Sequence, residues 1–273
     1  MMMFRKHYFP DFMTIGVQKS GTTTLHFLLN QHPDLVGSNP KEIHYFDKLP
    51  EDRRSLEWYK SHFSKSIFEK KRLFFETTPN YIYHRHIPAE LFALNPALKF
   101  IVMLRDPVTR CFSAWNMYKN MFEQYKNGKL PNSLGKDTPV FQYFFKDRTY
   151  FPTLEECINI ELGVMKQDQM VEPAILRRGL YYDQLTNYFE IFPHDIFFIV
   201  ESNDFRTNIY HYLDQIAYFL NVAPFNRNRL NMQNRHVRQY TDNMQNSTRT
   251  FLNDFYKEPN RKLYDLLGKH FNW

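Results

Sequence analysis

Short apolar runs alternate with stretches of helical periodicity along this chain. The runs consist mainly of apolar residues, as expected of strands that are buried on both faces of a sheet. They lie at residues 12–17, 73–76, 100–104 and 195–201, with a shorter one at residues 35–37. Helices are expected between and after them, at residues 22–29, 55–63, 86–94, 154–170, 181–192 and 208–220. This alternation predicts an α/β fold with a central parallel sheet flanked by helices.

Two polar stretches lack this pattern. Residues 118–147 are interrupted by Gly128, Pro131 and Gly135, which predicts a loop or an insertion over the ligand-binding site. Residues 231–241 are rich in Asn and Arg, and form either a binding loop or a solvated connection. Neither stretch has the composition of an interdomain linker, so we expect one domain over residues 1–273.

Charge and cysteine content narrow the class of protein. A formal net charge of +6 and a pI near 9.1 suit an acidic ligand, either a nucleotide-phosphate cofactor or a polyanionic acceptor. Cys111 and Cys157 are too few for a disulfide framework and are not spaced as metal ligands, so we expect free buried thiols and no metal. The N-terminal residues lack the apolar core of a signal peptide, and no run of about 18 apolar residues occurs. We therefore expect no transmembrane segment in this chain.

Residues 16–23 have the composition of an anion-binding loop. An apolar strand leads into Gly16, Lys19 lies in the turn, and Gly21 precedes a helix that opens with threonines. Backbone N–H groups and the positive end of the helix dipole would converge there on a phosphate or sulfate. Gly16 and Gly21 are spaced as in a nucleotide-triphosphate P-loop, but Thr22 stands where that motif requires lysine. The alternative is an ordinary glycine turn before a helix.

A second stretch has an arginine at the end of a buried strand. Arg105 follows the apolar run at residues 100–104, and Asp106 and Pro107 are residues that commonly begin a helix. Ligands of open α/β sheets bind at the carboxyl ends of the strands, so Arg105 and the hydroxyl of Ser113 could hold one phosphate. Arg105 could instead pair with Asp106 or with a carbonyl.

Glu42 and His44 are candidate acid–base residues. They lie two positions apart, and would share one side of the chain if this segment were extended. A carboxylate beside an anion site is a candidate general base. The alternatives are a surface salt bridge for Glu42 and a packed side chain for His44.

Taken together, four segments resemble sulfotransferases that use 3′-phosphoadenosine 5′-phosphosulfate (PAPS). Residues 16–23 resemble their 5′-phosphosulfate loop, and residues 105–113 resemble their 3′-phosphate-binding strand and helix. Residues 42–47 resemble the segment that carries the catalytic glutamate in the heparan sulfate branch, and residues 254–273 resemble the end of the same catalytic domains. The resemblance runs over nearly the whole chain.

The resemblance implies a role for each matched residue. Glu42 would be the general base, Lys19 would compensate charge on the leaving oxygen, and His44 would support the acid–base chemistry. Arg105 and Ser113 would hold the 3′-phosphate of PAPS or of its product PAP. The other cofactor-binding residues would be Gln18, Ser20, Gly21, Thr22 and Thr23 of the loop, Tyr181 of an Arg-x-Gly-x-Tyr-type segment, and Arg235 and Arg238 of a closing loop.

The acceptor and the compartment stay open. Gln18, Thr23 and Thr77 stand where heparan 3-O-sulfotransferases carry basic residues, and the loop is closer to that of the heparan N-sulfotransferase domain. We expect a hydroxyl or an amine of a carbohydrate, including a polyanionic one, and no nucleic acid. The alternatives are a sulfotransferase acting on a small-molecule or lipid alcohol, a P-loop-type nucleotide kinase, and a non-catalytic polyanion-binding protein. We expect a cytoplasmic enzyme, or a Golgi-lumenal catalytic domain if a membrane anchor has been trimmed from the chain.

Overall fold

The chain divides into two compact units. The structure is a computed structural model. It describes residues 5–7, 9–66, 72–129, 136, 139–166, 174–232 and 242–273. The first unit comprises Met1–Arg105 and Asp183–Val237, and the second comprises Asp106–Tyr182 and Arg238–Trp273. Each unit has its own apolar core. One domain over residues 1–273 stays a prediction.

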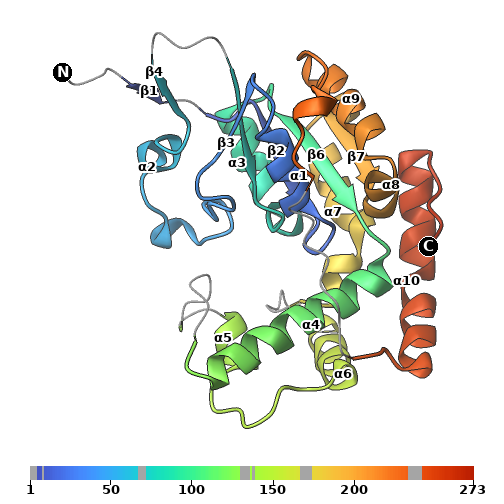
Figure 1. Cartoon of the computed structure of the whole chain (residues 1–273). Helices are drawn as coiled ribbons and strands as arrows, with labels where there is room; N and C mark the ends of the chain where they lie inside the picture. The colour runs from blue at the N-terminus through green and yellow to red at the C-terminus, as the bar shows by residue number, and fades with distance from the viewer. Residues whose placement is uncertain are drawn as a thin grey trace. The chain divides into compact units, whose positions relative to one another are not determined.

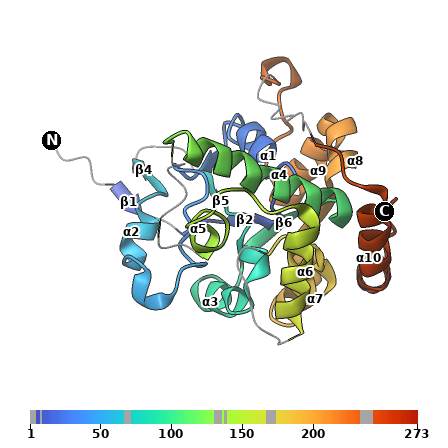
Figure 2. The ribbon, with the colours of Figure 1, turned by 90° about the horizontal axis from the view of Figure 1, so that it is seen from below.

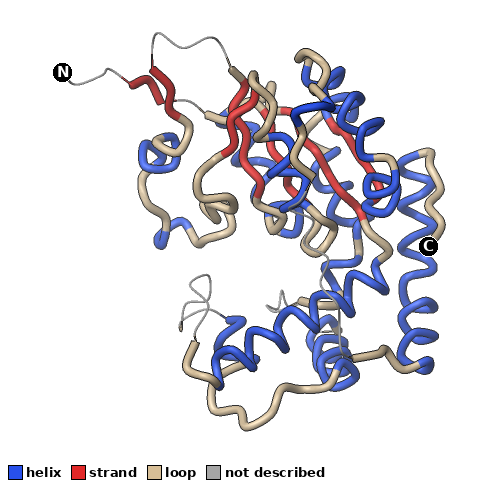
Figure 3. The backbone as a smooth tube through the Cα atoms, viewed as in Figure 1, coloured by secondary structure: helices blue, strands red, loops and turns tan. Residues whose placement is uncertain are grey.

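The first unit is built on a five-stranded sheet (Figures 1 and 3). The strand order is β3-β5-β2-β6-β7, and all four neighbouring pairs are parallel. The bounds are Leu35–Gly37 for β3, Leu73–Thr77 for β5, Phe12–Gly16 for β2, Lys99–Leu104 for β6 and Phe197–Glu201 for β7. The predicted parallel sheet is confirmed. Because the strands are parallel, the segments that follow them meet at one edge of the sheet.

Helices cover both faces of this sheet, as the view from below shows (Figure 2). On one face, apolar residues of β2 and β6 pack with those of α1 (Thr22–Leu29), α8 (Ser202–Thr207) and α9 (Ile209–Leu220). On the other face, Phe100 of β6 contacts Tyr188 of α7 (Tyr181–Phe189) and Phe192, which in turn contacts Phe92 of α3 (Ile87–Leu94). The alternation of side chains along β6 produces this division, because successive residues of a strand point to opposite faces.

Further elements of the first unit lie outside the sheet. β1 (Arg5–His7) and β4 (Ser64–Ser66) form a separate antiparallel pair, which the apolar pattern does not predict (Figure 3). The helix expected at residues 55–63 is the shorter α2 (Leu56–Lys60), which Ser55 caps. The 3₁₀ turns of this unit are Pro50–Asp52, Tyr81–Tyr83, His194–Ile196 and Arg227–Arg229.

The second unit is helical among its described residues. It contains α4 (Pro107–Lys126), α5 (Pro139–Phe144), α6 (Leu154–Met165), α10 (Asn246–Leu267) and the 3₁₀ turn η3 (Arg177–Gly179). Asp106 accepts hydrogen bonds from the N–H groups of Val108 and Thr109, as expected for the cap that begins α4. Cys111 and Cys157 are free and buried in the core of this unit, as predicted. No helix in the described part of the chain is long and apolar enough to cross a membrane.

The loop predicted at residues 118–147 is wrong over much of its length. α4 continues to Lys126, and α5 follows at Pro139–Phe144. Trp115, Tyr118 and Phe122 of α4 recur three and four positions apart and are buried. Polar residues fill the other positions of this helix, and they obscure its narrow apolar face in the sequence.

Candidate active site

Side chains from neighbouring strands hold the loop between β2 and α1. The hydroxyl of Ser20 donates to the carbonyl oxygen of Val17 at 2.6 Å. Arg105, which follows β6, donates from Nη1 to the carbonyl oxygen of Lys19 at 2.7 Å. Ser202, at the start of α8 after β7, donates from its hydroxyl to the carbonyl oxygen of Ser20 at 2.6 Å. The loop is therefore held by one internal bond and by two side chains from outside it, and Arg105 makes the carbonyl contact that the sequence leaves open as an alternative.

The end of this loop presents donors suited to an anion. Lys19 and Gly21 have left-handed backbone conformations, with φ of 74° and 100°. Gly21 is the N-cap of α1, no side chain caps this helix end among the described residues, and its first turn holds no acidic residue. The N–H groups of residues 22–24 therefore lie at the positive end of a helix dipole. Such a helix end fits a phosphate or sulfate group, and Lys19 lies in the turn that leads to it.

Two predicted cofactor residues of the loop point inward. Both donors of Ser20, its hydroxyl and its N–H, bond to the carbonyl of Val17. The Oε1 atom of Gln18 is buried and has no hydrogen-bond partner among the described residues. Ser20 therefore shapes the turn, whereas Gln18 has an acceptor that a ligand donor could satisfy. Thr22 is buried and Thr23 is exposed at the start of α1.

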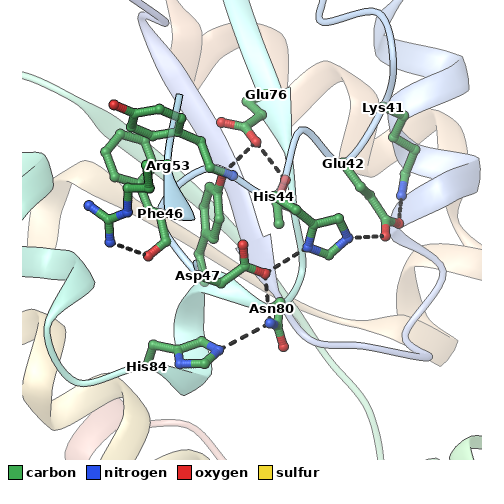
Figure 4. Close-up of polar contacts among 12 residues, drawn as sticks. Lys41, Glu42, His44, Phe46, Asp47, Arg53, Glu76, Asn80 and His84 are labelled. Atoms are coloured by element: carbon green, nitrogen blue, oxygen red, sulfur yellow. Dashed lines mark hydrogen bonds and ion pairs between the residues drawn. The ribbon is translucent and has the colours of Figure 1, made fainter. Parts of the chain in front are cut away.

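Glu42 and His44 meet, although their segment is not extended. Both residues are left-handed, with φ of 63° and 52°, so the backbone turns at each of them. The Nε2 atom of His44 nevertheless lies 3.4 Å from Oε2 of Glu42, while Lys41 forms an ion pair with Oε1 (Figure 4). The Glu42 carboxylate therefore has one cation at each oxygen.

These contacts shift both pKa values strongly. Burial alone would raise the pKa of Glu42, but the hydrogen bond from His44 and the charge of Lys41 outweigh it and lower the pKa from 4.5 to about 2. Burial alone would lower the pKa of His44, but its hydrogen bonds to Asp47 and Glu42 raise the pKa from 6.5 to about 10. At neutral pH, His44 is an imidazolium between two carboxylates.

Asp47 is the second partner of His44, and it is not among the site residues predicted from the sequence. Its Oδ2 atom lies 2.6 Å from Nδ1 of His44 and 2.7 Å from Nδ2 of Asn80. Burial alone would raise the pKa of Asp47, but the hydrogen bond to His44 reverses the effect and holds the pKa below its usual range. The three-residue spacing of His44 and Asp47 is a usable sequence signal, because this distance suits a turn.

A fully buried carboxylate at Glu76 is the other residue missed from the sequence. Three hydroxyl groups surround it: those of Tyr59 at 2.5 Å, Thr78 at 2.5 Å and Tyr81 at 2.8 Å. The Tyr81 oxygen also accepts from the N–H of Tyr45 at 3.0 Å. Burial raises the pKa of Glu76, against the hydroxyl donors, which stabilise its charge. An acidic residue within an apolar strand run was the available signal.

His26 connects α1 to the end of β5, the strand that carries Glu76. Its Nδ1 atom lies 2.9 Å from the hydroxyl of Thr77, at the end of β5. Burial and the positive charge of Lys41 lower the pKa of His26 from 6.5 to about 4, against the negative charge of Glu42. Lys41 and Glu42 are therefore near enough to α1 to act on one of its side chains electrostatically. The anion loop leads into α1, and the Glu42 segment lies near a side chain of the same helix.

The remaining predicted residues are in the second unit or outside the described residues. Ser113 on α4 and Tyr181 at the start of α7 are both buried. The segment before Tyr181 is held by Glu161, whose carboxylate accepts three backbone N–H groups, of Ile175, Leu176 and Arg177. Arg235 and Arg238 lie outside the described residues.

The fold and the loop together describe an α/β protein in which a loop suited to an anionic group follows a strand of the parallel sheet. Comparison with known proteins identifies the family. The family model described as "Sulfotransferase domain" matches residues 9–262. The chain therefore belongs to the sulfotransferase domain family, which confirms the predicted family.

Individual relatives agree with this assignment. The chain is 26% identical to the membrane-associated sulfotransferase kil1 of Dictyostelium discoideum, over 97% of this chain and 66% of that protein. It is 25% identical to the bifunctional heparan sulfate N-deacetylase/N-sulfotransferase 2 of Homo sapiens, over 95% of this chain and 30% of that protein. It thus spans less than two thirds of the length of each of these relatives. The crystal structure of a sulfotransferase from Alicyclobacillus acidocaldarius has the same fold, with a TM-score of 0.70, 20% identity, and coverage of 97% of this chain and 98% of that chain.

Proposed function

We propose that this protein transfers the sulfuryl group of PAPS to a hydroxyl or an amine of a carbohydrate acceptor, with Glu42 as the general base. The observation that carries the proposal is the combination, within one unit, of an anion loop anchored by Arg105 and a carboxylate paired with Lys41 and His44. Family membership supports the use of PAPS, and the heparan sulfate sulfotransferases among the relatives support a glycan acceptor.

The loop would hold the donor. PAPS, when bound, supplies a sulfuryl group on a good phosphate leaving group. Lys19 and the N–H groups at the start of α1 would compensate the negative charge that grows on the leaving oxygen. Arg105 would contact the 3′-phosphate, while its bond to the Lys19 carbonyl couples that contact to the loop. Gln18, Gly21, Thr22, Thr23 and Tyr181 are proposed as further cofactor contacts.

Glu42 would take the proton of the acceptor. With a pKa of about 2 it is ionised at every working pH, but it is a weak base. A weak base is sufficient here, because the acceptor hydroxyl becomes strongly acidic once its oxygen bonds to sulfur, so the proton moves late in the step. His44 would keep the carboxylate oriented, and the positive charges beside Glu42 would attract an anionic acceptor.

Calorimetric titration with PAP, run beside ATP–Mg²⁺, tests the donor. We expect PAP to bind, and we expect Arg105→Ala to weaken PAP binding about 100-fold, because a charge-assisted phosphate contact is lost. Ser202→Ala is the matched control, since it removes the other side-chain anchor of the loop without removing charge. Binding of ATP–Mg²⁺ in place of PAP would refute the sulfotransferase proposal in favour of a kinase.

Transfer of radiolabelled sulfate from PAPS to a panel of glycans and small alcohols tests the acceptor and the base. Glu42→Gln should abolish turnover and leave PAP binding within about twofold, because the general base acts on the acceptor. Turnover of Glu42→Gln near the wild-type rate would exclude Glu42 as the base while leaving the donor assignment intact. Turnover only with a small alcohol would refute the carbohydrate acceptor.

A further inference from the structure

The orientation of Asp47 depends on a single carboxylate oxygen. Oδ2 receives both hydrogen bonds, from His44 at 2.6 Å and from Asn80 at 2.7 Å. Oδ1 is buried and has no hydrogen-bond partner among the described residues. The side chain is only 4% exposed, so water does little to fix it. Two groups therefore determine where this carboxylate points.

Asn80 lies between Asp47 and a second histidine (Figure 4). It follows β5 and precedes the 3₁₀ turn Tyr81–Tyr83. Its Nδ2 atom also lies 3.1 Å from Nε2 of His84. An amide nitrogen has two hydrogens, so it can donate one to Asp47 and the other to an unprotonated His84 nitrogen. The reverse orientation of the amide would place its carbonyl oxygen against the carboxylate, so these partners fix the amide orientation as well.

Asp47 needs such a restraint because a like charge is close to it. Burial raises the pKa of Glu76, and the negative charge of Asp47 acts in the same direction, as expected for two carboxylates that repel each other. The cationic side is supplied by His44. Without Asn80, only His44 would hold Asp47 in place, and the pair could rotate together away from Glu42.

We propose that Asn80 is a positioning residue that fixes the Asp47 carboxylate, and through it the ring of His44, against Glu42. The contacts around Asp47 support this positioning role by themselves, whereas the effect of Asn80 on turnover rests on the proposed function. Asn80 touches neither Glu42 nor the anion loop through any hydrogen bond described in the structure. Its effect on the reaction therefore passes through Asp47 and His44.

The protonation of the His44 ring nitrogens is a direct measure of how well Asp47 is held in place. Nitrogen-15 spectra of histidine-labelled protein, with the His44 signals assigned from His44→Gln, would follow its titration. In the wild type His44 should stay charged through pH 8.5, in accord with its pKa of about 10. In Asn80→Ala we expect the titration midpoint to fall by about one pH unit or more, because Asp47 is the largest of the groups that raise it. This readout needs no substrate, so it stands whether or not the chain transfers sulfate.

Turnover provides the second readout. We expect Asn80→Ala to lower kcat about tenfold to 100-fold with KM within about twofold, because a misplaced acid–base group costs rate rather than binding. In an Asp47→Asn background the same substitution should change kcat less than about twofold, since its only route to Glu42 has been removed. Asn187→Ala is the matched control: it removes an asparagine bond to the neighbouring Arg85 carbonyl, at 3.2 Å, and lies outside the network.

Each possible result either supports or overturns the proposal. A His44 titration unchanged in Asn80→Ala would overturn the proposal, whatever the activity. An effect on kcat of equal size in Asn187→Ala, or an undiminished effect in the Asp47→Asn background, would also overturn it. If Asn80→Ala does not fold, Asn80→Leu, which keeps a similar size but has neither a donor nor a charge, must lower the His44 midpoint for the proposal to stand.

Discussion

The Nδ1 atom of His44 lies 2.6 Å from Oδ2 of Asp47, and this contact orients the ring so that its other nitrogen faces Glu42 at 3.4 Å. An imidazolium held in this way has a carboxylate on each side. The general base proposed here is therefore one end of a charge-compensated chain rather than an isolated carboxylate. Because the two partners come from one short segment, residues 42–47, a few backbone turns suffice to bring them together.

The His44 contacts make the stability of the fold depend on pH. The pKa of His44 is raised from 6.5 to about 10, so its contribution is complete below about pH 6.5 and is lost as pH rises toward 10. The side chain is 42% exposed, so we expect a contribution of up to about 1 kcal/mol, or about 2–4 °C in Tm. The Tm difference between wild type and His44→Gln should shrink between pH 6.5 and pH 10 in thermal melts. The exposed His211→Gln should show no such trend, and a difference that grows with pH would contradict the prediction.

Lys41 sets the acid limit of the reaction. Glu42 must be ionised to accept a proton, and His44 and Lys41 together lower its pKa to about 2 against the effect of burial. Lys41→Met should therefore raise this pKa and move the acid limb of the kcat profile to higher pH by about one unit, with little change in kcat at pH 7. Lys60→Met, which removes an exposed lysine–glutamate pair on α2, is the control. An acid limb that stays in place in Lys41→Met would show that another group limits the rate.

The apolar pattern predicts the sheet well because its strands are mainly apolar runs. The same reasoning locates Arg105 and the anion loop, since both follow directly from the ends of strands. It does not predict the β1–β4 pair, because pairing between segments so distant in sequence leaves no local pattern. It also misses the end of α4, whose apolar face is narrow.

The buried carboxylates show a different limit of prediction from sequence. Glu76 is tolerated inside the sheet because Tyr59 and Tyr81 bring hydroxyl groups from other segments. Asp47 likewise depends on Asn80, which is distant in the sequence. A single residue type cannot reveal such partners, so burial of a charge becomes visible only once the fold brings its donors together.

Tyr81 should stabilise the fold through its hydroxyl group. Tyr81→Phe removes a donor to the fully buried Glu76 carboxylate and an acceptor for the Tyr45 N–H. We expect a loss of about 1–3 kcal/mol in the free energy of unfolding, because a buried charged group and a buried N–H each lose a partner. Denaturant unfolding measures this loss. Tyr218→Phe, at a position 88% exposed, should leave the stability unchanged. Equal stabilities of the two variants would refute the stabilising role of the Tyr81 hydroxyl.

Gly179 should be sensitive to the smallest enlargement, whereas Gly163 should not. A Cβ atom at Gly179 would lie 2.7 Å from the Tyr256 ring and hydroxyl, but one at Gly163 in α6 would meet no atom within 4 Å. The Tyr256 hydroxyl donates to the Leu176 carbonyl at 2.6 Å, so displacing its ring also disturbs the turn that precedes Tyr181. We expect Gly179→Ala to cost about 1–3 kcal/mol of folding free energy and to weaken PAP binding severalfold, because the turn belongs to the proposed cofactor segment.

Gly163→Ala should instead be stabilising by about 0.5–1 kcal/mol, since alanine is the better helix former in a helix interior. Denaturant unfolding and PAP calorimetry on the two variants check both expectations. Unchanged stability of Gly179→Ala would mean that Tyr256 moves aside at little cost. Lost stability with full PAP affinity would confine this turn to a structural role and remove the segment around Tyr181 from the proposed cofactor site.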